Sequence, residues 1–326
     1  ATPTWSFVEI PLPTPLAVSA AYLGLIAVTE LLLRAADRRT GMVLWRERGG
    51  RPLPVPAVVI AAVVALLVGL LLLRPHPETR AGPGDLVVRV LDVGQGDSIL
   101  LDPPAADPVL IDTGPPGAGV AERLRELGVE SLAAVVISHD QSDHAGGLAE
   151  LLESLSVGRV VYGEVDPRLR RLALASGSTP VRLAEGGELD SGALRLTALW
   201  PPRELAARPS EDPNPLCLVL IAEWRHFSIL LQGDAEAEAA PIDPGPIDVL
   251  KVAHHGSDDA GLDALLDHSA PKLAVISVGE DNPYGHPTPE TISTLAEHRV
   301  PALRTDAAGE VTIEASPAGW TAIPAG

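Results

Sequence analysis

The densest group of possible metal ligands in this sequence lies in a short loop between two apolar runs. Residues 132–137 predict a buried strand, and residues 148–152 predict a helix. The loop between them holds two histidines and two carboxylates within six residues, namely His139, Asp140, Asp143 and His144. Imidazole and carboxylate together suit zinc, manganese or iron. The loop is therefore a candidate metal site, and the alternative is a polar turn whose histidines are merely solvated.

Four further polar clusters stand at the ends of predicted strands. They are Gln232–Asp234, Lys251–Ser257, Tyr284–Pro287 and, at the start of a strand, Asn214–Val219. Taken singly, each has an ordinary explanation, such as a turn or helix cap for Asp234 and a surface loop for His286. Strand ends in a layered sheet face one common crevice. The five clusters together therefore predict a single site.

The first 85 residues differ in composition from the remainder. Two stretches, at about 15–33 and 54–73, are long and apolar enough to cross a bilayer as helices, and Glu30 is the one charge in the first. Between them lie Arg34, Arg38, Arg39, Arg46, Arg48 and Arg51 against Asp37 and Glu47. This excess predicts a cytoplasmic loop, so that residues 86–326 would be extracytoplasmic. For each stretch, a buried helix of a soluble protein is the alternative.

The acidity of the chain belongs to its second part. Residues 86–326 carry 16 Lys and Arg against 37 Asp and Glu, a formal charge of about −21. Such a surface repels polyanions at long range, so nucleic acid would need metal ions or a local basic patch. The single cysteine excludes an internal disulfide and a Cys-based zinc finger. Five Tyr and Phe residues in all leave few platforms on which bases could stack.

Residues 86–326 are long enough to bury the core of a layered sandwich. Apolar runs predict strands at 85–93, 98–101, 109–111, 132–137, around 160, and at 194–199, 218–222, 227–231, 249–252, 273–278 and 311–313. Helices are predicted at 120–127, 148–152, 168–175, 262–266 and 289–297. The pattern predicts an α/β fold whose helices cover the outer faces of its sheets.

An ordered set of motifs in residues 86 to about 315 resembles the metallo-β-lactamase-fold domain of ComEC, the inner-membrane channel of bacterial DNA uptake. The motifs are Leu91–Ser98, Asp112–Gly114, Ser138–Gly147, Gln232–Asp234, Leu250–Ser257, Gly285–Pro287 and Arg304–Gly309. The resemblance implies a four-layered αββα sandwich with a metal crevice along the strand edges. It also implies a nuclease that degrades one DNA strand while the other passes through the channel. The two apolar stretches resemble the last spans of that channel.

The same resemblance implies one or two divalent ions, with zinc or manganese expected, because two cations can activate water and clamp a phosphate. Asp234 would bridge the ions, His139 would bind one, and Asp143 with His144 the other. His286 or one of His254 and His255 would complete the second site, and the remaining histidine of that pair would protonate the leaving oxygen. Lys251 would offset phosphate charge or simply occupy a strand face. The expected metal ligands are thus His139, Asp143, His144, Asp234, His255 and His286, with Lys251, His254 and His255 expected in catalysis.

Gln141 departs from the pattern of the wider fold, which reads His-x-His-x-Asp-His and in the ComEC family commonly has Asp at this position. A neutral amide is a poor ligand for zinc or manganese. The third histidine of the wider fold also has no clear counterpart, although Cys217 could supply a thiolate or be a buried apolar residue. One metal site is therefore expected to lack ligands, and the other to be complete.

We expect the chain to be the C-terminal portion of a larger multi-pass protein of the inner or plasma membrane, partly because it begins with Ala-Thr-Pro rather than Met. The leading hypothesis is a metal-dependent nuclease acting on incoming DNA, with the membrane, the channel-forming remainder of the protein and other DNA-uptake proteins as partners. The alternatives are a phosphodiesterase or esterase for a small extracellular substrate, and a degenerate domain that scaffolds or gates the channel.

Overall fold

The structure is a computed structural model that describes residues 84–163, 166–206 and 214–325. The two predicted spans, at about 15–33 and 54–73, and the arginine-rich loop between them lie outside the described residues. Within the described part, no helix combines the length and the apolar character needed to cross a bilayer.

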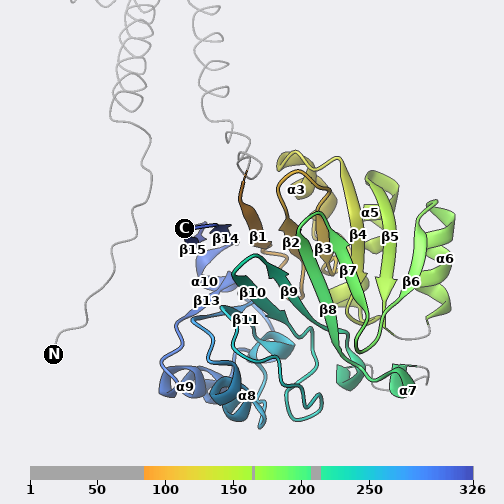
Figure 1. The fold of residues 1–326 in the computed structure, drawn as a ribbon. Coiled ribbons are helices and arrows are strands. Elements are labelled where there is room, and N and C mark those ends of the chain that lie inside the picture. Colours follow the sequence, from red (N-terminus) through yellow and green to blue (C-terminus); the bar gives the residue numbers. More distant parts are fainter. Residues whose placement is uncertain (1–83, 164–165, 207–213, 326) are drawn as a thin grey trace, which may run out of the picture. The chain divides into compact units, whose positions relative to one another are not determined.

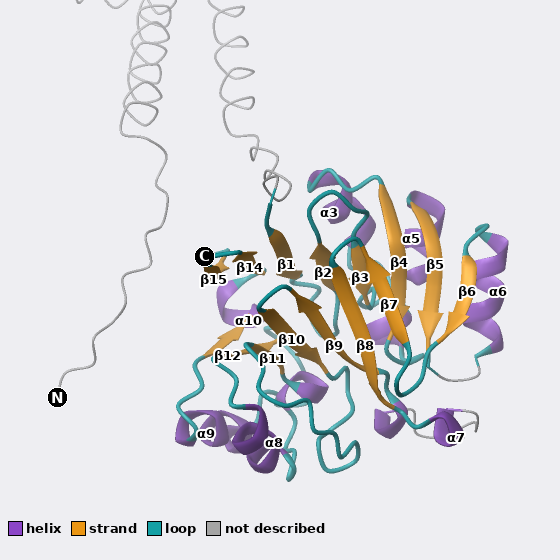
Figure 2. Ribbon diagram, viewed as in Figure 1, coloured by secondary structure: helices purple, strands orange, loops and turns teal. Residues whose placement is uncertain are grey.

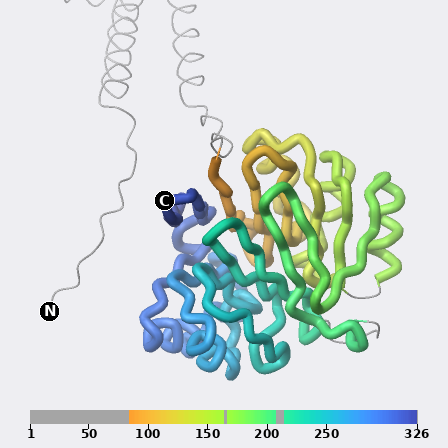
Figure 3. The backbone as a smooth tube through the Cα atoms, viewed as in Figure 1, coloured from red at the N-terminus to blue at the C-terminus, as the bar shows by residue number. Residues whose placement is uncertain are grey.

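The first sheet has eight strands within the described residues and combines both modes of pairing. In spatial order it holds β15 (Gly319–Pro324), β14 (Val311–Ser316), β1 (Leu86–Val90), β2 (Ile99–Asp102), β3 (Val109–Ile111), β4 (Ser131–Ile137), β5 (Ser156–Tyr162) and β6 (Thr179–Arg182). Pairing is antiparallel from β15 to β3 and parallel from β3 to β6. The C-terminal hairpin thus returns to the first sheet, and Figure 3 shows the dark blue end of the chain beside the orange start of β1.

The second sheet has seven strands in the described part and repeats this division. Its spatial order is β13 (Ala302–Arg304), β12 (Leu273–Ile276), β11 (Val249–Lys251), β10 (Phe227–Leu231), β9 (Val219–Trp224), β8 (Leu194–Trp200) and β7 (Glu188–Ser191). Strands β7 to β10 pair antiparallel, while β10 to β13 pair parallel. Figure 1 shows the two sheets facing each other.

Helices connect most of the parallel strands, because a parallel pair needs a long crossover connection. The connection from β10 to β11, at residues 232–248, is long but contains no helix. Between the parallel strands of the first sheet, the chain forms α3 (Val120–Glu126), α4 (Ser142–Ala145), α5 (Leu148–Ser154) and α6 (Pro167–Ala175). The second part of the chain contains α7 (Arg203–Ala206), η1 (Asn214–Leu216), η2 (Ala253–Gly256), α8 (Leu262–Ser269), α9 (Pro289–Glu297) and α10 (Thr305–Ala308). In Figure 2 the longer helices lie on the outer flanks of the strands.

Three clusters of buried apolar residues fill the spaces between the four layers. The first lies between the sheets and includes Val136 of β4 and Ile229 of β10. The second joins the first sheet to its helices, and there Val135 packs with residues of α3 and α5. The third joins the second sheet to α8 and α9. Neighbouring residues Val135 and Val136 thus face opposite layers and are both buried, which explains the continuous apolar run of β4. The predicted αββα sandwich is confirmed.

Parallel strands bring their carboxyl ends to one edge of a sheet. Four of the five polar clusters predicted from the sequence follow such strands. His139 comes after β4, Asp234 after β10, His255 after β11 and Tyr284 after β12, while Asp112 of the motif Asp112–Gly114 comes after β3. This arrangement places ligands from both sheets at one edge of the sandwich.

Candidate metal centre

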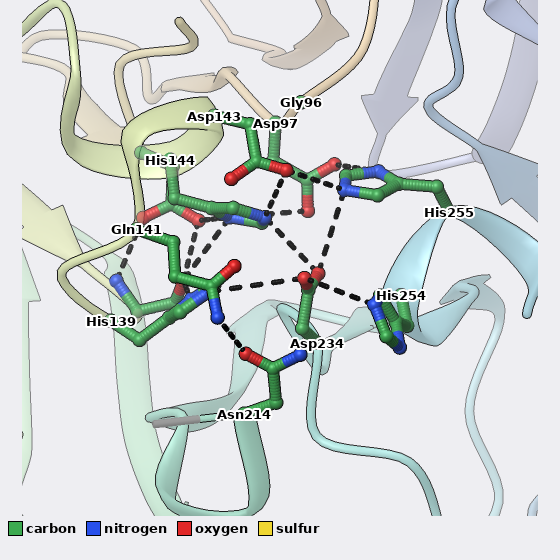
Figure 4. A network of polar contacts seen from close by, with 12 residues as sticks. Gly96, Asp97, His139, Gln141, Asp143, His144, Asn214, Asp234, His254 and His255 are labelled. Carbon is green, nitrogen blue, oxygen red and sulfur yellow. Dashed lines mark hydrogen bonds and ion pairs between the residues drawn. The ribbon is translucent and has the colours of Figure 1, made fainter. Parts of the chain in front are cut away.

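Asp234 lies at the centre of a group of histidines drawn from two segments, one after β4 and one after β11 (Figure 4). Its Oδ1 is 3.1 Å from Nε2 of His144 and 3.6 Å from Nε2 of His255. Its Oδ2 is 3.8 Å from Nε2 of both His139 and His254. The two oxygens of one carboxylate therefore face two different groups of ligands, as the predicted bridging role requires.

The first group is formed by four residues whose ligand atoms all lie within 4.8 Å of one another: Asp143, His144, Asp234 and His255. Asp143 is on α4, and its Oδ2 lies 3.5 Å from Nε2 of His255 and 4.0 Å from Nε2 of His144. The three members other than Asp143 are buried. Two imidazoles and two carboxylates give a mixed nitrogen and oxygen donor set.

Each histidine of the centre has an outer partner at its Nδ1. His144 is 2.8 Å from Oδ2 of Asp112, His255 donates to the carbonyl of Ser277 at 2.9 Å, and His254 is 2.9 Å from Glu236. The Nδ1 of His139 lies 3.0 Å from the hydroxyl of Ser138. Outer partners of this kind fix the tautomer and ring orientation of metal-binding histidines. Here they leave every Nε2 turned towards Asp234.

The inward atoms have no hydrogen-bond partner among the described residues, although they are buried. These atoms are His139 Nε2, His144 Nε2, His255 Nε2 and Asp234 Oδ1. Buried polar atoms in proteins are nearly always satisfied, so four such atoms at one point need an explanation. One divalent cation beside Oδ1 would satisfy the atoms of Asp234, His144 and His255, and a second beside Oδ2 would satisfy His139. Their chemistry suits zinc, manganese or iron. The residues therefore fit a divalent metal ion.

The pKa values of the centre follow from this concentration of charge. Burial alone would raise the pKa of Asp234, but His144, His255 and His139 outweigh it and hold the pKa well below its usual range. Burial likewise opposes protonation of His144, yet Asp234 and Asp112 raise its pKa well above the usual value. Burial, together with His144, lowers the pKa of His139 to about 4. At neutral pH, Asp234 is thus ionised and His139 neutral, the forms that bind metal, whereas His144 carries a proton that a bound ion would displace.

The second group lies around Oδ2 of Asp234 and is poorer in ligands. It contains His139 and His254, while the Nε2 amide of Gln141 donates to Oδ1 of Asn214 at 2.5 Å. Gln141 is the N-cap residue of α4, makes no capping bond with its side chain, and is the residue expected to replace a metal ligand. Cys217 is buried in the apolar cluster beneath the second sheet, as the apolar alternative for it predicted.

His254 and His255 are adjacent, and both have a left-handed backbone conformation. Their φ angles are +47° and +55°, a region that non-glycine residues rarely adopt. The turn sends the His255 ring to Oδ1 of Asp234 and the His254 ring to Oδ2. Such strained conformations collect at functional sites. The division of roles between the adjacent histidines is therefore a property of this turn.

Two of the expected residues lie away from the inner ligands. Lys251 is fully buried, and its Nζ is 2.6 Å from Oδ2 of Asp97 and donates to the carbonyl of Val252 at 3.0 Å. Its charge is thus paired inside the fold, as the alternative of a lysine that simply occupies a strand face predicted, and its catalytic role stays a prediction. His286 lies beyond His254, with 5.6 Å between the ring centroids, and burial lowers its pKa.

The sequence did not predict roles for Asp97 and Asp112. Both contact the outer nitrogen, Nδ1, of a histidine in the centre. Asp112 accepts hydrogen bonds from the backbone and hydroxyl of Ser138, both at 2.7 Å, besides holding His144. Asp97 lies 3.5 Å from Nδ1 of His255. A carboxylate directly after a buried strand, as at Asp112, was the available signal for this role.

The centre opens into a cleft of about 470 Å³. The cleft is lined by Gln95, Gln141, Ser142, Asp143, Asp234, His254, His255, Pro283, Tyr284 and His286. Neither lysine nor arginine is among these described lining residues. Any bound phosphate would thus face carboxylates, imidazoles and amides, and a cation at the centre would be the main attraction for it.

Comparisons with known proteins agree with this geometry. The chain is 30% identical over 254 residues to ComE operon protein 3 of Bacillus subtilis, an alignment that covers 69% of this chain and 32% of that protein. It is 31% identical to Recombination protein 2 of Haemophilus influenzae, an alignment that covers 69% of this chain and 28% of that protein. It is 29% identical to Competence protein ComA of Neisseria gonorrhoeae, where the alignment covers 90% of this chain and 39% of that protein. The chain spans about a third of the length of these curated relatives.

These relatives are ComEC-family competence proteins and confirm the resemblance inferred from the motifs. A family model described as the metallo-beta-lactamase superfamily matches residues 91–280, more than half of the chain. The matched range contains the four residues of the first ligand group. The chain belongs to the metallo-beta-lactamase superfamily.

Proposed function

We propose that this chain is the metal-dependent nuclease part of a DNA-uptake protein and hydrolyses phosphodiester bonds of incoming DNA. The observation that carries the proposal is the set of four buried, unsatisfied ligand atoms around Asp234 at the base of an open cleft. The competence proteins among its relatives favour DNA as the substrate.

The first ligand group, Asp143, His144, Asp234 and His255, would hold the more tightly bound ion. When bound, a divalent ion lowers the pKa of coordinated water and stabilises negative charge on a phosphoryl oxygen. The second group, in which His139 would be the imidazole ligand, lacks the ligand that Gln141 replaces and would bind an ion more weakly. His286, at 5.6 Å from His254 between ring centroids, would line the substrate cleft rather than bind the first ion.

His254 is suited to donate a proton to the leaving oxygen. Its side chain is 32% exposed in the cleft, unlike the fully buried ring of His144. The hydrogen bond from its Nδ1 to Glu236 raises the pKa of His254, which favours the protonated ring near neutral pH. A general acid works best when its pKa lies near the operating pH. Glu236 would thus orient the ring and keep its proton on Nε2.

We place the domain outside the cytoplasm, with residues 1–85 as two membrane spans and a cytoplasmic loop. The apolar stretches and the arginine excess between them support this arrangement. DNA would reach the domain as it approaches a channel formed by the remainder of the protein and by other uptake proteins.

The direct test is cleavage of a labelled single-stranded oligonucleotide by the full chain with manganese or zinc. Asp234→Asn should abolish cleavage and lower metal content, because the amide removes the charge that both groups share. Asp267→Asn is the matched control, since Asp267 is 69% exposed on α8. Circular dichroism would establish that both variants are folded. Unchanged cleavage by Asp234→Asn would refute the proposal.

Two alternatives have an observation in their favour. The small, acidic cleft favours a phosphodiesterase or esterase for a small substrate, which would cleave model diesters but not DNA. The Gln141–Asn214 amide pair favours a degenerate domain that scaffolds or gates a channel. In that case the purified chain would hold no metal and cleave neither substrate.

A further inference from the structure

Tyr284 is a large side chain that the fold leaves in solvent at the mouth of the cleft. Its exposed fraction is 67%, the highest of the three exposed large hydrophobic residues in the described part of the chain, the others being Leu174 and Ile323. Of these three, Tyr284 is the one that lines the cleft above the metal centre. An exposed tyrosine alone is ordinary, so its surroundings decide whether it has a role.

A row of rings connects Tyr284 with the metal centre. Nε2 of His254 is 3.8 Å from Oδ2 of Asp234, and the His254 and His286 ring centroids are 5.6 Å apart. The Tyr284 ring follows at 5.9 Å from His286, tilted by 31°. The row therefore leads from the carboxylate at the base of the cleft to the solvent at its mouth.

The loop that carries Tyr284 is held in place by Asn282. The side chain of Asn282 donates to the carbonyls of Gly279 at 2.9 Å and His286 at 2.8 Å, and accepts from the backbone N–H of His286 at 3.1 Å. These bonds close the loop around Tyr284. A ring on an anchored loop loses little conformational entropy when a ligand covers it.

The charges of the cleft make such a ring useful for a polyanionic ligand. The described lining residues include Asp143 and Asp234 and no lysine or arginine, so the phosphate backbone gains little attraction beyond the ion itself. Base stacking needs no charge and is tolerant of sequence, because every base has an aromatic face. In a duplex that face is covered by the neighbouring pairs.

We propose that Tyr284 stacks on an unpaired base of the strand whose phosphate lies at the metal centre, and that the cleft thereby selects single-stranded over paired DNA. This inference rests on the proposed nuclease function and names its substrate class. Tyr284 contacts substrate in this scheme and takes no part in bond cleavage, so its removal should raise KM and leave kcat nearly unchanged.

The test compares three substrates of equal length with the full, manganese-loaded chain: a single strand, an oligomer of abasic deoxyribose phosphates, and a fully paired duplex. Tyr284→Ala should raise KM for the single strand about 5- to 100-fold, the range expected when one stacked ring is removed. KM for the abasic oligomer and for the duplex should not change, because neither offers a base face. Tyr284→Phe, which keeps the ring, should restore the KM for the single strand. Ile323→Ala, an exposed residue of β15, is the matched control.

The outcomes separate this inference from the function on which it rests. If the unaltered chain cleaves the single strand and Tyr284→Ala has the same KM for it, the stacking role is overturned and the nuclease stands. An equal rise in KM for the abasic oligomer would overturn it as well. If the unaltered chain cleaves none of the three substrates, the proposed function itself fails, and the inference fails with it.

Discussion

Oδ2 of Asp112 lies 2.8 Å from Nδ1 of His144, which leaves the Nε2 of that histidine facing Asp234 at 3.1 Å. When an ion is bound, a carboxylate in this position keeps the proton on Nδ1 and leaves the lone pair of Nε2 to the metal. The arrangement joins the end of β3 to the end of β10 through one imidazole ring, and thus couples the first sheet to the ligand supplied by the second.

Asp112→Asn should therefore weaken metal binding about 10- to 100-fold. The amide can turn its N–H₂ towards Nδ1, which favours the tautomer whose proton points at the metal. Competition with a chelating dye would measure the affinity. Asp107→Asn, an exposed aspartate before β3 whose side chain accepts from Ser131, is the control. Asp112 also accepts two bonds from Ser138, so folding must be measured in parallel; a folded variant with unchanged affinity would contradict the assignment.

The second ligand group should gain an ion when its missing ligand is supplied. Gln141→Asp replaces a neutral amide, now bonded to Asn214, with a carboxylate that zinc and manganese prefer. We expect the bound metal per chain to rise from about one ion to about two, as measured by elemental analysis after dialysis. Ser142→Asp, the control, adds the same charge at the next residue and should leave the bound metal per chain unchanged. Equal metal content in the unaltered chain and in Gln141→Asp would show that Gln141 does not limit the second group.

The strands that the sequence predicted best are the buried ones. The run at 132–137 corresponds to β4 and the run at 227–231 coincides with β10, since strands covered on both faces are apolar throughout. The sequence did not predict the four strands at the edges of the two sheets, which are β6, β7, β13 and β15. These strands have half-exposed or polar sequences without a continuous apolar run. Their pairing depends on the neighbouring strand, so their own residues give little indication of a strand.

The position of the site was predictable because its ligands follow buried strands, but the roles within it were not. His254 and His255 themselves form a turn with two positive φ angles, and no residue type in the sequence indicates such a turn. Lys251 follows the pattern of a strand residue near a phosphate site, yet its charge is directed inward at Asp97. That pairing joins residues more than 150 positions apart and depends on how the two sheets face each other.

Asp248 should stabilise the fold in a way that depends on pH. Its Oδ1 accepts from Lys272 at 2.6 Å, and its Oδ2 accepts from the backbone of Ser228 at 3.1 Å. Burial alone would raise the pKa of Asp248, but bonds from Lys272, Trp320 and Ser228 lower it below 3.8. A carboxyl whose pKa is lower in the folded state stabilises above the unfolded pKa and loses that contribution as pH falls through the folded value.

Asp248→Asn should accordingly lower the free energy of unfolding by about 1 kcal/mol at pH 7, a modest value because Lys272 is largely exposed. The difference from the unaltered chain should stay constant down to about pH 5 and shrink below about pH 4. Urea denaturation across this range would measure it. A difference that grows as the pH falls would contradict the lowered pKa.

Lys251→Met tests whether this lysine acts on substrate or within the core. Its ammonium is fully buried and 2.6 Å from Asp97, so its removal leaves a buried carboxylate without its partner. We expect a loss of about 3 to 5 kcal/mol in the free energy of unfolding, as is usual when one member of a buried pair is removed. Replacing both residues, as in Lys251→Met with Asp97→Leu, should recover part of this loss because no charge then stays buried alone. Full stability of Lys251→Met together with lost cleavage of DNA would instead show that the lysine contacts the substrate phosphate.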